Sequence, residues 1–381
     1  FVKWWLVYHQ TNFELIGFPM LNVKKAVLML SAAMLLQGCA QQAVVEVADI
    51  VYPPAPNEPR FYYQETIMHS GQIEIESEDR MLQRILVGQS RTVFGLGKPF
   101  DLVVKNGRIY MSDSTGRKVL VLDRMVGKVI EIRDAGIEQI SAPFAVKVSD
   151  AGDIYVVDGT LKKVLVFDEN GDFIKSIGSS DMFDKPTGLA VTADGSKVYV
   201  ADTGGVSSQR HHVRVFNGHT GEHLYDLGSR GTEPGQFNLP KNIVLTPDGL
   251  LAVNDSANFR IQIIDPITGD MVRTMGSIGM NFGQFARPKG IDVDVDGNIY
   301  VADAQLGNTQ IFNKEGQLLM HIGQRGEYNR PGIFLLPAGI ALDEDGRLYM
   351  IDQFFAKIDV FRPASLGKYE GSFALPRPKQ K

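Results

Sequence analysis

Residues 287–303 read RPKGIDVDVDGNIYVAD, and related copies of this stretch recur along most of the chain. Each copy has a proline near its start, an apolar run, a glycine turn and a second apolar run that ends at an aspartate. The shared prolines are Pro99, Pro143, Pro186, Pro240, Pro288 and Pro337. Their spacings are 44, 43, 54, 48 and 49 residues by subtraction. This spacing is the period of a propeller blade.

Each repeat predicts four antiparallel strands. The Asp-Gly pair in DVDVDGNIYVAD is a strong hairpin signal between the first two strands. A third apolar run follows, such as KVLVLD from residue 118, and a fourth lies beyond another glycine turn, such as QLLMHIG from residue 317. Six such units predict an all-β, six-bladed β-propeller over residues 61–375, because a closed ring buries the faces that one blade leaves exposed.

Closure of this ring usually needs a strand from one end of the chain beside the blade at the other end. RFYYQETI at 60–67 precedes the first unit and has no other assigned role. MLQRILVG at 81–88 resembles the fourth strands, and GKYEGSFAL at 367–375 competes for the same place. We favour pairing of 60–67 beside the last blade, with the other two segments as alternatives.

The amino end predicts a leader that is removed. The chain starts with Phe1, and Met20 opens a stretch with two lysines and a short apolar core, which is typical of a secretory signal. We therefore expect residues 1–19 to be upstream sequence read through in frame and residues 20–38 to be a signal peptide.

Leu36-Gln37-Gly38-Cys39 resembles the lipobox of bacterial lipoproteins, in which the cysteine is acylated. The resemblance implies lipidation of Cys39, attachment to the membrane and a place in the bacterial cell envelope. Ala40 after the cysteine favours the outer membrane by the sorting habit of that family. The alternative is a buried cysteine at the end of a hydrophobic helix.

Residues 39–60, with four prolines, predict an extended tether, and residues 376–381 predict a disordered tail.

Composition narrows the functional classes. The formal net charge of -5 disfavours a nucleic-acid partner, because phosphate binding needs a concentrated positive surface. One cysteine cannot form an internal disulfide. No Gly-x-Ser-x-Gly elbow and no phosphate-binding glycine loop before a helix occurs, so the sequence offers no catalytic residues.

PKGIDVDVDGNIYVAD from Pro288 and DSANFRIQIID from Asp255 resemble the NHL repeat family, and the likeness extends from Pro99 to Phe361. Other repeats depart from the family pattern, since NTQIF at 308–312 lacks its arginine. The resemblance implies a six-bladed propeller. It says little about activity, because this fold hosts lyases, RNA binders, sensors and recognition domains. Relatives among bacterial lipoproteins often accompany multihaem c-type cytochromes, which implies such a cytochrome as a protein partner.

Two acidic patterns suggest cation binding. Asp292, Asp294 and Asp296 match an EF-hand loop in spacing, but the repeat favours a hairpin turn at Asp296-Gly297. An aspartate also ends the second strand of every unit: Asp113, Asp158, Asp202, Asp255, Asp303 and Asp352. We favour a structural role in which these carboxylates accept backbone N–H groups of the following loop. The alternative is a carboxylate ring that binds a cation at the channel mouth.

The third unit is the longest and carries VSSQRHHVRVF from residue 206. Several imidazoles here could hold a metal, although a solvated loop insertion is the favoured interpretation. Because projecting loops on a rigid scaffold tend to carry specificity, we take Gly204, Gly205, Arg210, His211 and His212 as the candidate binding loop.

The preferred hypothesis is a lipid-anchored, non-enzymatic scaffold or accessory subunit that binds a protein partner or a carbohydrate, with an electron-transfer assembly as one setting. It needs no cofactor. The alternative is a metal-dependent lyase or hydrolase at the channel mouth, with calcium or zinc. RNA binding is a third hypothesis, and the acidic composition disfavours it.

Overall fold

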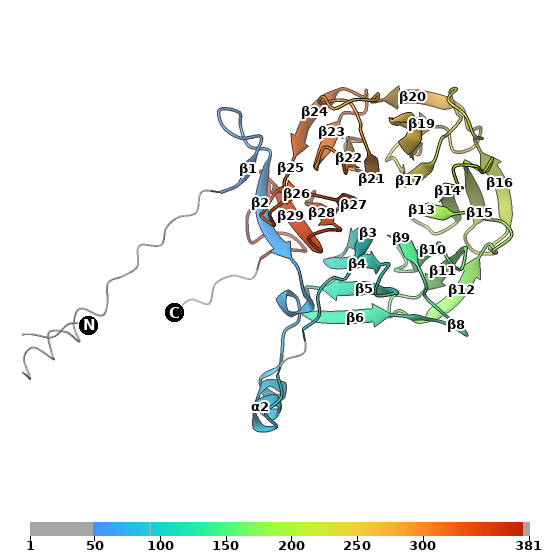
Figure 1. Cartoon of the computed structure of the whole chain (residues 1–381). Coiled ribbons are helices and arrows are strands. Elements are labelled where there is room, and N and C mark those ends of the chain that lie inside the picture. Colours follow the sequence, from blue (N-terminus) through green and yellow to red (C-terminus); the bar gives the residue numbers. More distant parts are fainter. Residues whose placement is uncertain (1–48, 91–92, 376–381) are drawn as a thin grey trace, which may run out of the picture. The chain divides into compact units, whose positions relative to one another are not determined.

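The computed structural model describes residues 49–90 and 93–375, which form six β-sheets arranged in a ring about a central axis (Figure 1). The predicted all-β, six-bladed propeller is confirmed. The expected upstream segment, signal peptide and lipidated Cys39 lie outside the described residues, as does the tail from residue 376.

Each blade has an inner strand at the channel and a second strand beside it. The inner strands are β3 (Pro99–Lys105), β9 (Pro143–Val148), β13 (Pro186–Val191), β17 (Pro240–Leu245), β21 (Pro288–Val293) and β27 (Pro337–Leu342). The second strands are β4 (Arg108–Asp113), β10 (Ile154–Asp158), β14 (Lys197–Asp202), β18 (Leu251–Asp255), β22 (Ile299–Asp303) and β28 (Leu348–Asp352).

A third and an outer strand complete each blade. The third strands are β5 (Lys118–Asp123), β11 (Lys163–Phe167), β15 (His212–Asn217), β19 (Arg260–Ile264), β23 (Asn308–Phe312) and β29 (Lys357–Pro363). The outer strands are β6 (Lys128–Ile132), β12 (Phe173–Ile177), β16 (His223–Leu227), β20 (Met271–Met275), β24 (Leu318–Ile322) and, in the sixth blade, β2 (Phe61–Ile67).

Short elements lie in the connections and at the edge of the sixth blade. They are β1 (Val51–Tyr52), β7 (Asp134–Ala135), β8 (Glu138–Gln139), β25 (Gln324–Arg325), β26 (Ile333–Phe334), η1 (Ser70–Gln72), η2 (Ser256–Asn258) and α2 (Glu78–Leu86).

The register of the strands gives the ring two unlike faces. In every blade the shared proline at the start of the inner strand pairs with the aspartate that ends the second strand, as Pro288 does with Asp303. The loops before the inner strands and after the second strands therefore lie on one face, which we call the loop face. The tight hairpins inside each blade lie on the other face, the turn face.

The core lies between neighbouring blades. Each apolar cluster combines side chains of two adjacent sheets, and Val156 of β10 and Tyr110 of β4 belong to one such cluster. The second strands are buried on both sides, as IYVVD of β10 is throughout, because each is covered by a blade on either side. Neighbouring inner strands contact one another around the whole ring, from β3 through β9, β13, β17 and β21 to β27 and back to β3.

The ring closes through the amino-terminal strand. β2 pairs antiparallel with β29, with Phe61 opposite Pro363 and Ile67 opposite Ile358. The favoured closure by residues 60–67 is confirmed. The sheet extends further than the sequence suggested, because Val51 and Tyr52 of β1 pair with β2. Part of the expected tether is thus a hairpin on the propeller, with Tyr52 packed edge-on against Phe361.

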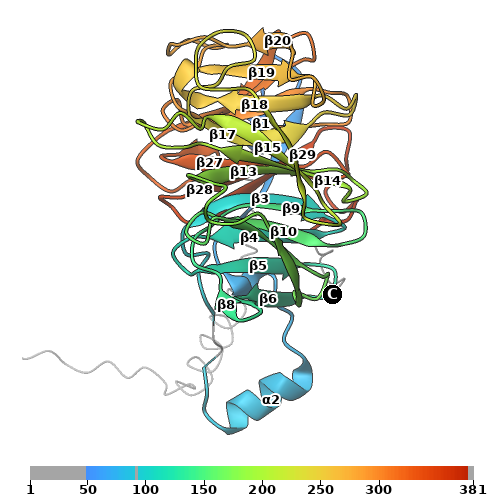
Figure 2. The ribbon, with the colours of Figure 1, turned by 90° about the vertical axis from the view of Figure 1, so that its right-hand side faces the viewer.

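The two alternative closing segments have other structures. Residues 81–88 are not a strand: most belong to α2, which projects from the rim of the ring beyond β6 (Figures 1 and 2). The 367–375 segment forms no strand, and its Phe373 is buried against Tyr349. Within residues 49–90 and 93–375, no helix has both the length and the apolar character needed to cross a bilayer.

Replacing Ile67 with alanine should lower the free energy of unfolding by about 3 kcal/mol, because the fully buried side chain leaves a cavity where the ring closes. Urea unfolding of the purified protein measures this. Ile75→Ala is the matched control, since that side chain is 74% exposed and should change stability little. Equal losses in the two variants would contradict closure through β2.

Candidate functional site

The channel opens on the loop face into a cavity of about 360 Å³. Its lining comes from the residues that flank the shared prolines, together with residues that follow the second strands. Since these positions occur at the start of each inner strand, the blades meet here and several of them contribute side chains. This cavity is the candidate functional site, and we call it the channel mouth.

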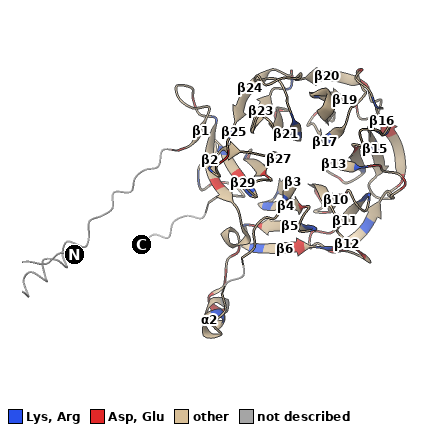
Figure 3. Cartoon of the chain, viewed as in Figure 1, with Lys and Arg blue, Asp and Glu red and all other residues tan. Residues whose placement is uncertain are grey.

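Five cationic side chains line the channel mouth. Lys98 comes from the first blade, Lys185 from the third, Lys241 from the fourth, and Arg287 and Lys289 from the fifth. Each stands immediately before or after a shared proline. Figure 3 marks lysine and arginine in blue, and blue segments lie on inner strands around the channel. Positive charge is therefore concentrated here despite the acidic composition of the chain.

These cations lack acidic partners. Among the described residues, none of the five forms an ion pair, and the one hydrogen bond from their side chains joins Lys289 Nζ to Gln353 Oε1 at 3.1 Å. Buried cations elsewhere in the ring are paired: Lys357 binds Asp359 at 2.7 Å and Arg347 binds Asp345 at 2.8 Å. At the channel mouth Lys98, Lys185 and Arg287 are exposed, whereas Lys241 and Lys289 are partly buried without an acidic partner among the described residues.

Burial and, to a lesser extent, nearby like charges lower the pKa of two lysines. Burial, reinforced by Arg287 and Lys241, lowers the pKa of Lys289 from 10.5 to about 8. Burial, followed by Arg287 and Lys185, also lowers the pKa of Lys241. Both shifts mean that the protein holds positive charge at neutral pH at a cost in stability. An anion bound among these groups would relieve that cost.

Two aromatic side chains also line the channel mouth. Phe100 and Phe144 follow the prolines of the first two blades, and their ring centroids lie 4.8 Å apart at 36°. The second residue after the shared proline is glycine in three blades. A Cβ added at one of them, Gly290, would lie 2.3 Å from the Ala338 carbonyl oxygen. Asp101 occupies that position in the first blade and lines the cavity.

The six aspartates that end the second strands bind backbone. Asp303 accepts N–H groups of Ala286 and Arg287 on one oxygen, at 2.8 and 2.9 Å, and of Gln305 and Leu306 on the other, at 2.8 and 3.0 Å. Each of the other five, Asp113, Asp158, Asp202, Asp255 and Asp352, also accepts at least one N–H from the loop before its inner strand. Their oxygens are committed to the loops that carry the channel-mouth residues.

The loop that resembled an EF-hand is a hairpin turn between β21 and β22. Asp294 accepts the N–H groups of Asp296 and Asn298 at 3.0 and 2.8 Å, and Gly297 takes a left-handed φ of 82°. Asp292 instead accepts the Leu342 N–H of the next blade at 2.7 Å. In the part of the chain that the structure describes, no three His, Cys, Asp or Glu side chains gather in a way that could hold a metal ion.

The candidate binding loop lies beside the channel mouth, after β14. Its histidines are not brought together as a metal site. His211 is fully buried, with Nε2 3.0 Å from the Gly205 carbonyl and Nδ1 accepting the Leu239 N–H at 3.3 Å. His212 is also buried, its Nε2 has no hydrogen-bond partner in the described part of the chain, and burial lowers its pKa.

Only the outer part of this loop is exposed, while its histidines are buried. The solvated insertion that the sequence favours therefore describes part of the loop and not all of it. A Cβ added at Gly205 would have no described atom within 4 Å, Val206 is 80% exposed, and the exposed Arg210 donates to the Asp181 carbonyl at 3.1 Å. Gly204 has a left-handed φ of 60°. His219 and His223 lie at the other end of β15, near the turn face.

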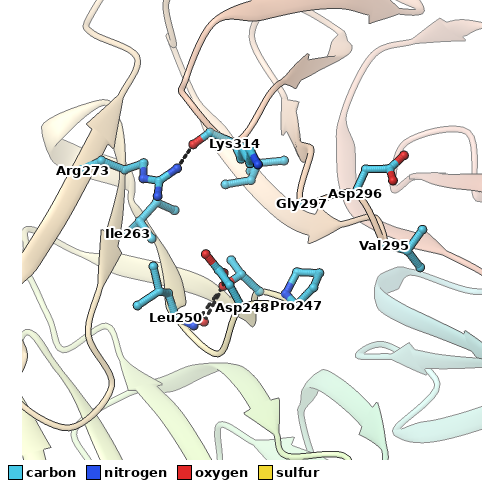
Figure 4. A pocket seen from close by; sticks show the side chains of 11 residues that line it. Pro247, Asp248, Leu250, Ile263, Arg273, Val295, Asp296, Gly297 and Lys314 are labelled. Carbon is cyan, nitrogen blue, oxygen red and sulfur yellow. Dashed lines mark hydrogen bonds between the residues drawn. The ribbon is translucent and has the colours of Figure 1, made fainter.

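A second hollow, of about 180 Å³, lies between hairpins of the fourth and fifth blades on the turn face (Figure 4). Its polar groups are engaged with one another: Arg273 donates to the Lys314 carbonyl, and Thr246 donates to Asp248 at 2.5 Å. We assign it no function.

The sequence contains a pattern that indicates the channel mouth, but the alignment of the repeats did not use it. The aligned segments begin KPF, APF, KPT, LPK, RPK and LPA, so lysine, arginine and phenylalanine repeatedly flank the shared proline. Residues shared by all repeats serve the fold, whereas residues that differ at one register position can serve a site. Sequence reasoning examined the shared aspartates and missed these variable neighbours.

No protein-family model matches the chain. Similar solved structures include a gluconolactonase from Xanthomonas campestris, with 17% identity, a TM-score of 0.54 and coverage of 70% of this chain and 86% of that chain. Virginiamycin B lyase from Staphylococcus aureus shows 14% identity and a TM-score of 0.51 over 70% and 94% of the two chains. Hydrazine synthase from Kuenenia stuttgartiensis shows 17% identity and a TM-score of 0.51 over 70% and 96%.

The shared feature is the propeller fold. At these identities the likeness carries no activity from those proteins to this chain.

Replacing Lys289 with methionine should raise the free energy of unfolding at pH 7 by about 1 kcal/mol, because it removes a charge that burial, Arg287 and Lys241 disfavour. Solvent screening keeps the gain this small. The folded-state pKa of about 8 lies below the unfolded value of 10.5, so the folded protein loses its proton first as pH rises. The gain should therefore shrink between pH 8 and 10.5. Urea unfolding across this range measures it. Lys128→Met, at an exposed position on β6, is the control, and an equal gain there would contradict the crowding of charge.

Replacing Asp303 with alanine should lower the free energy of unfolding by about 3 kcal/mol, because buried N–H groups lose their acceptor. The loss should be the same with and without added calcium. Thermal unfolding compares it with Asp296→Ala, whose carboxylate is exposed and should matter little. Calcium that stabilises the wild type but not Asp303→Ala would instead favour the cation-site alternative.

Proposed function

We propose that this protein is a non-enzymatic binding module that recognises an anionic group at the channel mouth. The observation that carries the proposal is the set of five cationic side chains without acidic partners around one cavity. Burial and neighbouring cations disfavour the charged forms of Lys241 and Lys289, and an anionic ligand would offset that cost. The arrangement suits binding of negative charge rather than the metal chemistry of a lyase or hydrolase, since cations disfavour a metal ion nearby.

The loop face around the channel mouth suits a protein partner. Exposed apolar side chains stand on its loops, among them Val206, Ile278, Met280, Phe282 and Phe354, which are 80%, 67%, 61%, 62% and 63% exposed. Large apolar residues on exposed loops favour contact with another protein. The cations of the channel mouth favour a partner with acidic surface residues. We place this contact on the loop face, with the loop from Gly204 to His212 as part of it.

The setting of this module follows from the sequence predictions. We propose that lipid on Cys39 holds it at the bacterial cell envelope, in the outer membrane, as a scaffold or accessory subunit. An electron-transfer assembly with a multihaem cytochrome is the partner suggested by the NHL resemblance. A metal-dependent enzyme at the channel mouth is the competing proposal.

A pull-down from gently solubilised envelopes tests the proposal, with the full lipid-anchored chain as bait. The expected result is a reproducible partner that is lost with Lys241→Glu combined with Arg287→Glu. The matched control reverses two exposed lysines elsewhere, Lys128→Glu with Lys314→Glu, and should retain the partner. Metal analysis of the same bait separates the alternatives: near-stoichiometric calcium or zinc with no partner would overturn the binding module and favour an enzyme.

A further inference from the structure

The channel mouth has two chemically different sides. In a ring of six blades the first lies opposite the fourth and the second opposite the fifth. Phe100 and Phe144 therefore face Lys241 and Lys289 across the channel, with Arg287 beside Lys289. A ligand that fills the cavity meets aromatic carbon on the first and second blades and three cations on the fourth and fifth, while Lys98 and Lys185 add positive charge from the first and third blades.

The aromatic side is fixed in place. The Phe100 and Phe144 rings pack on each other, and a Cβ added at Gly159 would lie 2.2 Å from a ring atom of Phe144. The glycine therefore leaves the space that the ring occupies. Both phenylalanines are only half-buried, so ring carbon stays accessible from the cavity.

A buried carboxyl group keeps acidic groups away from the aromatic side. Asp101 is 2% exposed, and its Oδ1 has no hydrogen-bond partner among the described residues. Burial, opposed by Lys147, raises the pKa of Asp101 to about 6, so at neutral pH it is mostly ionised. A ligand carboxylate beside it would meet like charge, which directs acidic groups to the side with Lys241 and Lys289.

The cationic side also offers an unused hydrogen-bond donor. Gln353 lines the cavity, and its Oε1 accepts the Lys289 ammonium. Its Nε2 has no partner among the described residues, although it is shielded from solvent. Buried amide donors are seldom left unpaired in folded proteins, so this group favours an acceptor atom supplied by a ligand.

We propose that the channel mouth binds a small organic polyanion that contains a flat ring. The acidic groups face Lys241, Arg287 and Lys289, and the ring packs on Phe100 and Phe144. This inference rests on the proposed anion recognition and adds the ring as the feature that selects among anions. Carboxylate and phosphate groups share the required chemistry.

Calorimetric titration of the full chain in mild detergent tests the ring requirement. Trimesate carries three carboxylates on a benzene ring, and tricarballylate carries three on a propane chain. The charges match, and the ring is the main difference. Trimesate should bind about tenfold more tightly, as expected for one aromatic contact. The same comparison is made between phenyl phosphate and methyl phosphate. Tighter binding of the carboxylate pair or of the phosphate pair shows which acidic group the cavity prefers.

Two variants locate the preference. Phe144→Leu and Phe100→Leu should each reduce the trimesate preference to less than threefold while leaving tricarballylate affinity unchanged. Phe173→Leu, on the outer strand of the second blade, should keep the preference. Thermal unfolding of each variant checks that the ring of blades is intact. If one variant fails to fold, the other still tests the preference.

The outcomes separate this inference from the proposed function. Equal affinity for ring and chain compounds in both series would overturn the ring requirement and leave anion recognition standing. No binding of any probe would overturn the inference as well. In that case, loss of the partner on reversing Lys241 and Arg287 would still support recognition of an acidic protein surface, whereas its retention would end both proposals.

Discussion

The carboxylate that ends each second strand is the contact on which both the fold and the candidate site depend. It lies opposite the shared proline, and its oxygens hold the N–H groups of the loops on either side. In five blades this carboxylate also accepts the N–H of the residue just before the shared proline. Those residues are Lys98, Ala142, Lys185, Arg287 and Leu336. Three of these residues are channel-mouth cations. The conserved geometry of the repeat thus fixes the backbone from which the variable charges project.

The fourth blade shows how the same backbone position is satisfied by another group. Leu239 precedes the shared proline there, and its N–H is bound by His211 Nδ1 rather than by Asp255. Asp255 is instead engaged by the side chains of Arg260 and Gln262, at 2.8 and 3.1 Å. A histidine that looks like a metal ligand in the sequence is therefore part of the support of the channel mouth. Its position in the third blade also ties that blade to the fourth.

The sequence predicted the fold well because the fold depends on features that every repeat shares. Proline, the turn glycine and the strand-ending aspartate recur at fixed positions, and the alternating apolar runs between them define the strands. The segment 81–88 was harder, because its apolar residues Met81, Leu82, Ile85 and Leu86 suit a strand by composition. They recur at helical spacing after Glu78 and Asp79, which favours the observed helix. The channel mouth was missed because it is built from the differences among repeats, and only the ring brings residues of distant repeats into one cavity.

Closure by the amino-terminal strand has a consequence for the order of assembly. β2 emerges from the ribosome before all six inner strands, while β29, its partner, emerges after all of them. Throughout synthesis the strand that seals the ring must stay unpaired, with an open edge that any neighbouring strand could occupy. The five preceding blades can form as each is completed, but the sixth waits for the two ends of the chain to meet. A truncation that removes β2 from the amino side and one that removes β29 from the carboxyl side therefore damage the same sheet.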